Sequence, residues 1–379
     1  MYKDYRVEAF IPAGRKRTMS ILLDNLSRFQ SVVDRVQIWF NTDESQKEDN
    51  AWLESLPDIY GDWVKLVKLT PEQYNIKPKQ LRTGLFYSEN TIDEDTIYIR
   101  FDDDIVFIDD AFFRNLLDFR LEHPEYFLVM ANILNNAITS YIYQQLGMVG
   151  TTHGTVEEPF CMEPTAWRSG PFATELHTTL VNHIATNTTD ELFFDHADLE
   201  NASRFSISCF CFFGRDFAKF DGVIGQRRKG TVYRDEEIFL TEIYPTLHDK
   251  LNTICGTALV AHYSFFAQRP YLDKTDVLDR YAAIAKGKLS DSYYELLDTD
   301  QPEKKAGRKI YETVELPPVH QVSAYTAAVL AEKLGYRAVE EFDRVLIMYK
   351  DVVVKTMLGK MLTDQDIDRA LAAAYAGNH

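Results

Sequence analysis

The chain has 379 residues, of which 45% are hydrophobic and 26% are charged, and its formal net charge is −17. This composition is typical of a globular protein with a sizeable core, and the acidic charge disfavours proteins that bind nucleic acid or anionic membranes. No apolar stretch reaches the ~18 residues of a membrane span, and the N-terminus lacks the apolar segment of a signal peptide, so we expect a cytoplasmic protein. The four cysteines form no CxxC pair, which disfavours disulfides and a zinc site and predicts buried thiols at Cys209 and Cys211.

Strand and helix patterns alternate along the first hundred residues. Strands are predicted over 6–12, 35–40, 63–69 and 96–101, with helices over 18–33 and 78–89. This alternation indicates an α/β fold with a Rossmann-like sheet. Ligands of such sheets bind at the carboxyl ends of the strands.

Further along the chain, the pattern predicts a helix over 110–126, a buried strand over 126–134, and loops with short helices over 150–205. A strand from 206, a helix over 234–247 and a strand over 256–266 follow. After a polar connection, three helices are predicted over 322–336, 339–362 and 363–377. We therefore expect three parts, over residues 1–120, over residues 121–272, and in a mainly helical C-terminal extension over residues 273–379.

An aspartate triplet follows the fourth predicted strand, in the sequence YIRFDDDIVFIDD. On an extended segment Asp102 and Asp104 would point to one side and Asp103 to the other. Two carboxylates on one side, together with phosphate oxygens and water, suit Mg²⁺ or Mn²⁺. The alternative interpretation is a solvated acidic turn, but the apolar strands on both sides of the triplet favour a metal–nucleotide site.

A β/α half that ends in a hydrophobic strand and a DxD motif resembles the glycosyltransferases of GT-A fold, over about residues 5 to 270. The resemblance implies a mixed central sheet, a nucleotide-diphosphate sugar as donor, most commonly a UDP-sugar, and Mn²⁺ or Mg²⁺ as cofactor. Asp104 would be the direct metal ligand, and Asp102 would contact the ribose or metal-bound water, so both belong to the predicted metal site. By the same resemblance, residues 1–120 would form the nucleotide-sugar-binding half and residues 121–272 the acceptor-binding and catalytic half. The resemblance also implies donor-binding roles for further residues, which are Pro12, Ala13 and Arg15 after the first strand, Asn41 and Asp43 after the second, Lys79 and Arg82 before the fourth, and Asp102 with Asp103 in the triplet.

Two later segments carry candidates for the acceptor side and the metal. Inverting members of this family use a carboxylate in the second half as general base, and Asp235 and Glu236 in YRDEEIF occupy that position. An acidic helix start explains such residues equally well without catalysis. His262 is a candidate third metal ligand by the same resemblance, or else a half-buried strand histidine. Tyr233, Tyr263 and Trp167 are candidates for stacking on a sugar ring.

Other enzyme classes are disfavoured because GxGxxG, Walker, GxSxG and HExxH motifs are absent. The predicted function is a metal-dependent transfer of a sugar to an acceptor hydroxyl, with inversion. The alternatives are a nucleotidyltransferase acting on a sugar phosphate and a non-catalytic nucleotide-sugar-binding module. The acceptor stays open among glycan, lipid, protein and modified nucleic-acid base. Apolar segments of the C-terminal helices would allow a homo-oligomer.

Overall fold

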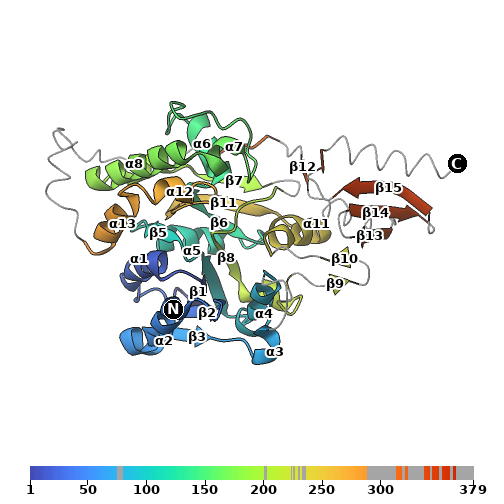
Figure 1. Ribbon diagram of the computed structural model, residues 1–379, viewed down its shortest axis with the longest axis horizontal. Helices are drawn as coiled ribbons and strands as arrows, with labels where there is room; N and C mark the ends of the chain where they lie inside the picture. The colour runs from blue at the N-terminus through green and yellow to red at the C-terminus, as the bar shows by residue number, and fades with distance from the viewer. Residues whose placement is uncertain are drawn as a thin grey trace.

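The computed structural model describes residues 1–74, 80–199, 203–222, 224, 227–228, 231–232, 236–287, 313–317, 321–322, 337–341, 344–349, 352–358 and 362–363. Figure 1 shows a central sheet surrounded by helices. The strands of this sheet are β1 (Arg6–Ala13), β2 (Arg35–Phe40), β3 (Val64–Val67), β4 (Thr96–Phe101), β5 (Ile105–Ile108), β6 (Val129–Leu134), β7 (His196–Leu199), β8 (Cys209–Phe213) and β11 (Asn252–His262). The predicted strands at 35–40 and 96–101 coincide with β2 and β4.

The sheet is mixed and has the order β3-β2-β1-β4-β8-β6-β11-β5, with β7 pairing to β11. Parallel pairs join β3, β2, β1 and β4 in the first part of the chain. Strand β8 then inserts antiparallel between β4 and β6. This arrangement confirms the predicted α/β class with a mixed central sheet.

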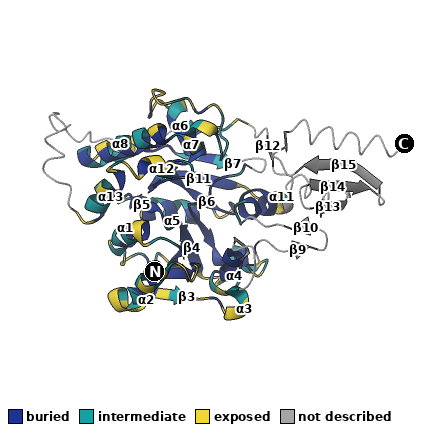
Figure 2. Ribbon diagram, viewed as in Figure 1, coloured by how far each residue is buried: buried dark blue, intermediate teal, exposed yellow. Residues whose placement is uncertain are grey.

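The sheet is covered on both faces, as its sequence pattern requires. Every residue of β4, β5, β6 and β8 is buried, and these strands are dark blue in Figure 2. Continuous apolar runs are typical of strands buried on both faces. The predicted burial of the Cys209 and Cys211 thiols is confirmed, and both are free.

The helices are α1 (Lys16–Ser27), α2 (Lys47–Tyr60), α3 (Pro71–Tyr74), α4 (Gln80–Asn90), α5 (Phe112–Glu122), α6 (Ala137–Gln145), α7 (Pro164–Arg168), α8 (Gly170–Thr186), α9 (Gly214–Ala218), α10 (Glu236–Ile238), α11 (Tyr244–His248), α12 (Arg269–Leu272) and α13 (Val277–Ala285). A π-helical turn, η3 (Phe239–Ile243), joins α10 to α11, so the helix predicted over 234–247 is confirmed from residue 236. Helix α1 packs against β5, α5 packs against β11, and α2 packs against β3.

The prediction of only loops and short helices over 150–205 is wrong, because α8 has 17 residues. Ser169 caps its start by accepting a hydrogen bond from the Phe172 backbone N–H, and Pro171 occupies the first turn. Leu176 and Leu180 face the core at helical spacing. Threonines with low helix propensity obscured this pattern, and tertiary packing overrides that propensity.

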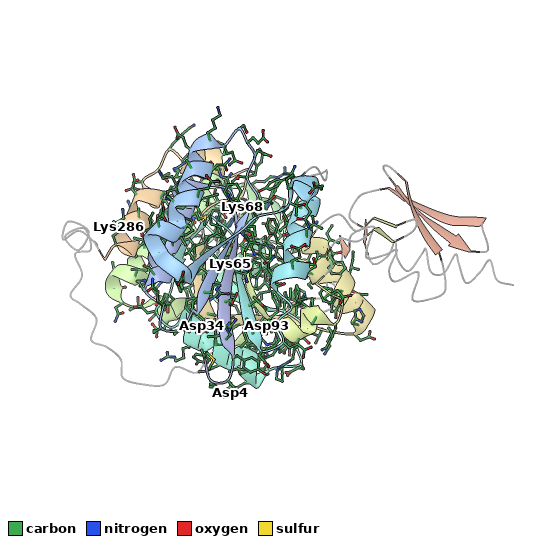
Figure 3. The ribbon with its side chains drawn as sticks, turned by 90° about the horizontal axis from the view of Figure 1, so that it is seen from below. Asp4, Asp34, Lys65, Lys68, Asp93 and Lys286 are labelled. Atoms are coloured by element: carbon green, nitrogen blue, oxygen red, sulfur yellow. The ribbon has the colours of Figure 1, made fainter. Side chains whose placement is uncertain are left out.

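The parallel strands define two edges of the sheet. In Figure 3 Asp4, Asp34 and Asp93, which precede β1, β2 and β4, lie toward one edge, and Lys68, which follows β3, lies toward the other. The aspartate triplet follows β4 and therefore belongs to the carboxyl edge.

The helix predicted over 339–362 is wrong, because a three-stranded antiparallel sheet occupies most of this range. Its strands are β13 (Arg337–Glu341), β14 (Arg344–Tyr349) and β15 (Val352–Leu358). The run of Val352, Val353 and Val354 is β-branched, which favours strand over helix. The other two predicted C-terminal helices fall largely outside the described residues.

Two short strand pairs accompany this sheet. They are β9 (Arg227–Arg228) with β10 (Thr231–Val232), and β12 (Gln321–Val322) with β16 (Leu362–Thr363). Strand β13 contacts β10, as Figure 1 also shows. The division of the chain into parts at residues 120 and 272 remains a prediction. The first two parts share one sheet, in which β5 of the first part pairs with β11 of the second. A homo-oligomer likewise remains a prediction, and β14 and β15 replace the helices on which it was based.

Candidate active site

A cavity of about 710 Å³ opens at the carboxyl ends of β4 and β11. Its described lining combines four carboxylates, four guanidinium groups, one imidazole, a set of hydroxyls and a set of apolar side chains. These are Asp102, Asp104, Glu236 and Glu237; Arg15, Arg100, Arg204 and Arg269; His262; Thr83, Ser206, Ser208 and Ser264; and Met162, Trp167, Ile207, Phe265 and Phe266.

The aspartate triplet forms a tight turn between β4 and β5. The Ile105 backbone N–H donates to the Asp102 carbonyl oxygen at 3.1 Å, and the Asp102 N–H donates to the Ser208 carbonyl at 2.8 Å. Asp102 and Asp104 both line the cavity, as predicted, although a turn rather than an extended segment brings them together.

Asp103 lies on the other side of this turn, against the loop that follows β1. The Arg15 Nε donates to its two carboxylate oxygens at 3.0 and 3.2 Å. Gly14 allows this approach, because a Cβ there would lie 3.0 Å from the Asp103 Oδ2. Burial raises the pKa of Asp103 to about 6, against the opposing effect of Arg15. Asp103 therefore anchors the turn to the β1–α1 loop.

Asp104 lies among three cationic groups from different parts of the chain. Its Oδ2 is 3.0 Å from the Arg15 Nη1 and 3.4 Å from the Arg269 Nη2, and its Oδ1 is 3.5 Å from the His262 Nε2. Burial by itself would raise the pKa of Asp104, but His262, Arg15 and Arg269 together hold that pKa well below its usual range. Asp104 is therefore an ionised carboxylate under positive charge from three directions.

The His262 imidazole is oriented for this contact. A register irregularity between Ala261 and His262 interrupts the β5–β11 pairing, after which His262 pairs with Ile105. The Nδ1 lies 3.2 Å from the Asn135 carbonyl oxygen, which assigns it the proton and leaves Nε2 facing Asp104. Burial opposes protonation, but Asp104 outweighs it and raises the pKa of His262. Histidines that bind metals are commonly oriented by such a carbonyl contact.

The donor chemistry of the cavity fits a divalent cation. Asp102, Asp104 and His262 supply oxygen and imidazole ligands of the kind that Mn²⁺ accepts. Among the residues that the structure describes, no group of three or more His, Cys, Asp or Glu side chains is already gathered tightly enough to hold a metal. Asp104 is instead paired with Arg15, Arg269 and His262, so metal binding would require these contacts to rearrange.

A second ionic cluster joins Asp102 to Glu236. The Arg100 Nη2 donates to the Asp102 Oδ1 at 2.8 Å, and its Nη1 pairs with Glu236. The Tyr87 hydroxyl donates to the same Glu236 Oε1 at 2.5 Å. Burial and Glu236 both raise the pKa of Tyr87, so the phenol stays protonated as a donor. One buried guanidinium thus connects the aspartate turn to the start of α10.

Glu237 lies beside this cluster and pairs with a different arginine. Its Oε1 accepts a hydrogen bond from the Arg204 Nε at 2.6 Å. Ser206 and Ser208 line the same part of the cavity. This side of the cavity is therefore polar.

The other predicted site residues lie around the cavity or outside the described residues. Asn41 donates to Thr83 at 3.3 Å, and Thr83 lines the cavity. Arg82 is buried, with its guanidinium 5.6 Å from the Tyr74 ring centre. Pro12 and Ala13 end β1, and Asp43 is exposed after β2. Lys79, Tyr233 and Asp235 lie outside the described residues. The donor-binding, stacking and general-base roles of these residues stay predictions.

Sequence reasoning included Arg15 but missed two other arginines of the site, Arg100 and Arg204. Arg100 stands inside the apolar strand YIRF, and a charged residue in such a strand is a detectable sign of a buried ion pair. No comparable pattern marks Arg204, Phe265 or Phe266, which only the fold brings to the cavity.

Comparisons with known proteins add little. No protein-family model matches the chain. No curated protein matches it. Among the residues searched, no helix is long and apolar enough to cross a membrane.

Several solved structures show weak similarity. One is 4-diphosphocytidyl-2C-methyl-D-erythritol synthase from Anaerococcus prevotii DSM 20548, with 14% identity over 34% of this chain and 55% of that chain, at a TM-score of 0.25. Another is CMP:2-keto-3-deoxy-manno-octonic acid synthetase complexed with CTP, with 15% identity over 33% of this chain and 52% of that chain, at 0.24. The chain thus spans little more than half the length of these two structures.

A third is glucosyl-3-phosphoglycerate synthase from Mycobacterium tuberculosis in complex with Mn²⁺, UDP-glucose and phosphoglyceric acid, with 14% identity over 50% of this chain and 68% of that chain, at 0.28. At these TM-scores the similarities carry no argument about this chain. The fold class rests on the sheet itself, and the function rests on the cavity.

Proposed function

We propose that the protein is a metal-dependent glycosyltransferase that moves a sugar from a nucleotide-diphosphate sugar, with UDP-sugars as the first candidates, to an acceptor hydroxyl. The observation that carries the proposal is that Asp102, Asp104 and His262 line one cavity at the carboxyl edge of the sheet, where Arg15 and Arg269 also lie. Carboxylates and an imidazole beside two arginines suit a divalent cation together with a diphosphate.

Asp102, Asp104 and His262 would hold the cation, Mn²⁺ or Mg²⁺, which would neutralise the charge that develops on the diphosphate leaving group. Arg15 and Arg269 contact Asp104 through nitrogens that are also suited to phosphate oxygens. Both guanidinium groups are about one-third exposed, so a ligand can reach them. Arg15 stays anchored by Asp103 when Asp104 turns to the cation.

The acceptor would enter beside Glu236 and Glu237. Arg100 and Tyr87 fix Glu236 at the cavity wall, and Arg204 fixes Glu237. A carboxylate within reach of the acceptor hydroxyl can take its proton, which is the role we assign to Asp235 or Glu236 in an inverting reaction. The polar contacts of Glu236 with Arg100 and Tyr87 orient it at the cavity wall.

The first experiment is a thermal-shift panel of nucleoside diphosphates and nucleotide sugars, with and without Mn²⁺. We expect one nucleotide to stabilise the wild type only with metal, because a ligand at 100 times its Kd adds about 2.7 kcal/mol. EDTA and the Asp104→Asn substitution should each abolish the shift.

A flat panel in the wild type would contradict the donor-site proposal. Incubating the protein with a nucleoside triphosphate and a sugar phosphate separates the nearest alternative, since a nucleotidyltransferase releases pyrophosphate and a glycosyltransferase does not. Binding without transfer or hydrolysis of the sugar would favour a binding module.

A further inference from the structure

We propose that the cavity binds a neutral saccharide as acceptor, and that four side chains receive its apolar face. These are Met162, Trp167, Phe265 and Phe266, together called the apolar wall. The inference rests on the proposed function, because it names the acceptor class of the same site.

The apolar wall begins at the point where the sugar would be transferred. The Phe265 ring packs edge-on against the His262 imidazole, with ring centres 4.8 Å apart. Trp167 follows, 6.3 Å from Phe265 between ring centres. Phe266 lines the same cavity and is 82% exposed. A flat molecule that lies on the Phe265 ring would therefore be close to His262.

The apolar wall is held in place by one buried amide pair. The Gln268 Oε1 accepts from the Phe265 backbone N–H at 3.0 Å, and its Nε2 donates to the carbonyl of Ala166, which precedes Trp167, at 2.7 Å. Gln268 also exchanges hydrogen bonds with Asn135 at 3.0 and 3.1 Å. Because the Asn135 carbonyl orients His262, the same pair positions both the apolar wall and the imidazole. Rings fixed in this way bind a ligand without an ordering cost.

The lining of the cavity also has a polar part. Arg204, Glu237, Ser206 and Ser208 present charged and hydroxyl groups. A cavity lined by both apolar and hydrogen-bonding groups matches a sugar ring, which has C–H groups on its faces and hydroxyls at its edge. A lipid chain would remove water from these polar groups and offer them no hydrogen bonds in return.

The charge on the acceptor side of the cavity also favours a neutral occupant. Arg100 pairs with Asp102 and Glu236, and Arg204 pairs with Glu237. Binding of a polyanion depends on cations that neutralise its phosphates, and both of these arginines are already paired with carboxylates. The chain's net charge of −17 acts in the same direction.

The test is a saturation-transfer NMR titration of the full-length protein with Mg²⁺ and UDP, using the neutral trisaccharides maltotriose, cellotriose and N,N′,N″-triacetylchitotriose as probes. At least one should bind at millimolar concentration. Trp167→Ala and Phe266→Ala should each raise its Kd about tenfold, as expected for loss of one aromatic contact. Trp167→Phe should retain most of the affinity. Ile59→Ala removes an apolar side chain of similar exposure (61%) from α2 and should change nothing.

Thermal shifts with UDP and Mn²⁺, measured on every variant, separate the two proposals. A normal thermal shift with the nucleotide would retain the donor site. If no trisaccharide then binds, or if neither Trp167→Ala nor Phe266→Ala weakens its binding, the saccharide site is overturned. Trisaccharide binding that is weakened by the wall substitutions, without any thermal shift from the nucleotide, would retain the saccharide site and overturn the donor site. Wall-dependent binding of a DNA oligomer in place of the trisaccharides would overturn the neutral acceptor.

Discussion

Two carboxylates of the cavity are surrounded differently. Asp104 faces Arg15, Arg269 and His262, which come from the β1–α1 loop, α12 and β11. Glu236 faces one arginine and one tyrosine, and that arginine also pairs with Asp102. Two arginines and an imidazole thus surround Asp104, whereas Glu236 and Asp102 share a single arginine. An anionic donor should therefore bind at Asp104, and the Glu236 side should position the acceptor.

The largest effect on activity is expected from a substitution of Asp104. Asp104→Asn should lower transfer activity at least about 100-fold, because a ligand of the proposed cation and its charge stabilisation are lost. Steady-state kinetics with saturating Mn²⁺ would measure this. Asp110→Asn is the matched control, since its side chain is 88% exposed on the same segment. Equal activity of wild type and Asp104→Asn would contradict the proposal that the donor binds at Asp104.

Arg100→Met should be the most destabilising change in the Glu236 cluster. It leaves Asp102 and Glu236 without their shared, buried partner, and such a loss costs about 3 kcal/mol or more. Denaturant unfolding would measure the free energy of unfolding. Arg100→Lys keeps the charge but cannot reach both carboxylates with separate nitrogens, so it should fall between the wild type and Arg100→Met. A neutral result for Arg100→Met would show that the cluster has no structural role.

His177 contacts the backbone next to His262, and its protonation gives a pH-dependent test of how much that contact stabilises the fold. It is buried between the Tyr263 carbonyl oxygen and the Tyr281 hydroxyl, and burial lowers the pKa of His177 to about 4. The unfolded chain takes up this proton near pH 6.5, so the contribution of neutral His177 is present above that pH and is lost as the pH falls towards 4.

The difference in unfolding free energy between the wild type and His177→Gln should therefore shrink by about 3 kcal/mol from pH 7 to pH 4. Denaturant titrations across this range would measure it. A difference that does not change with pH would show that His177 takes up its proton at the same pH in the folded and unfolded chains.

The smallest effect is expected at Gly14. Gly14→Ala places a methyl group 3.0 Å from the Asp103 Oδ2, which must move while Arg15 holds it. A cost of about 1 kcal/mol is typical of such crowding. Repeating the substitution in an Arg15→Met background frees Asp103 and should reduce the cost. Thermal unfolding of the four proteins forms the cycle, and equal costs in both backgrounds would show that Arg15 does not restrain the turn.

Local pattern was sufficient for the first half of the sheet and for its acidic turn. Strands β2 and β4 follow from their β-branched, apolar runs, and the triplet follows β4 in the sequence itself. Sequence patterns failed to predict the secondary structure of segments that depend on contacts with other parts of the chain. The α8 segment is rich in threonine and becomes helical through its cap and its packing. Residues 337–358 contain apolar runs that suit either structure, and cross-strand pairing makes them strands.

The sequence by itself determined that acidic residues stand at the carboxyl end of a buried strand, because strand, turn and triplet are consecutive. The tertiary structure decided which cations meet them. Arg15 and Arg269 are 254 positions apart, and they converge on Asp104 because β11 returns beside β5 and α12 follows it. The apolar wall arises in the same way, from α7 and the loop after β11. Contacts between segments distant in sequence depend on chain topology, which local periodicity does not encode.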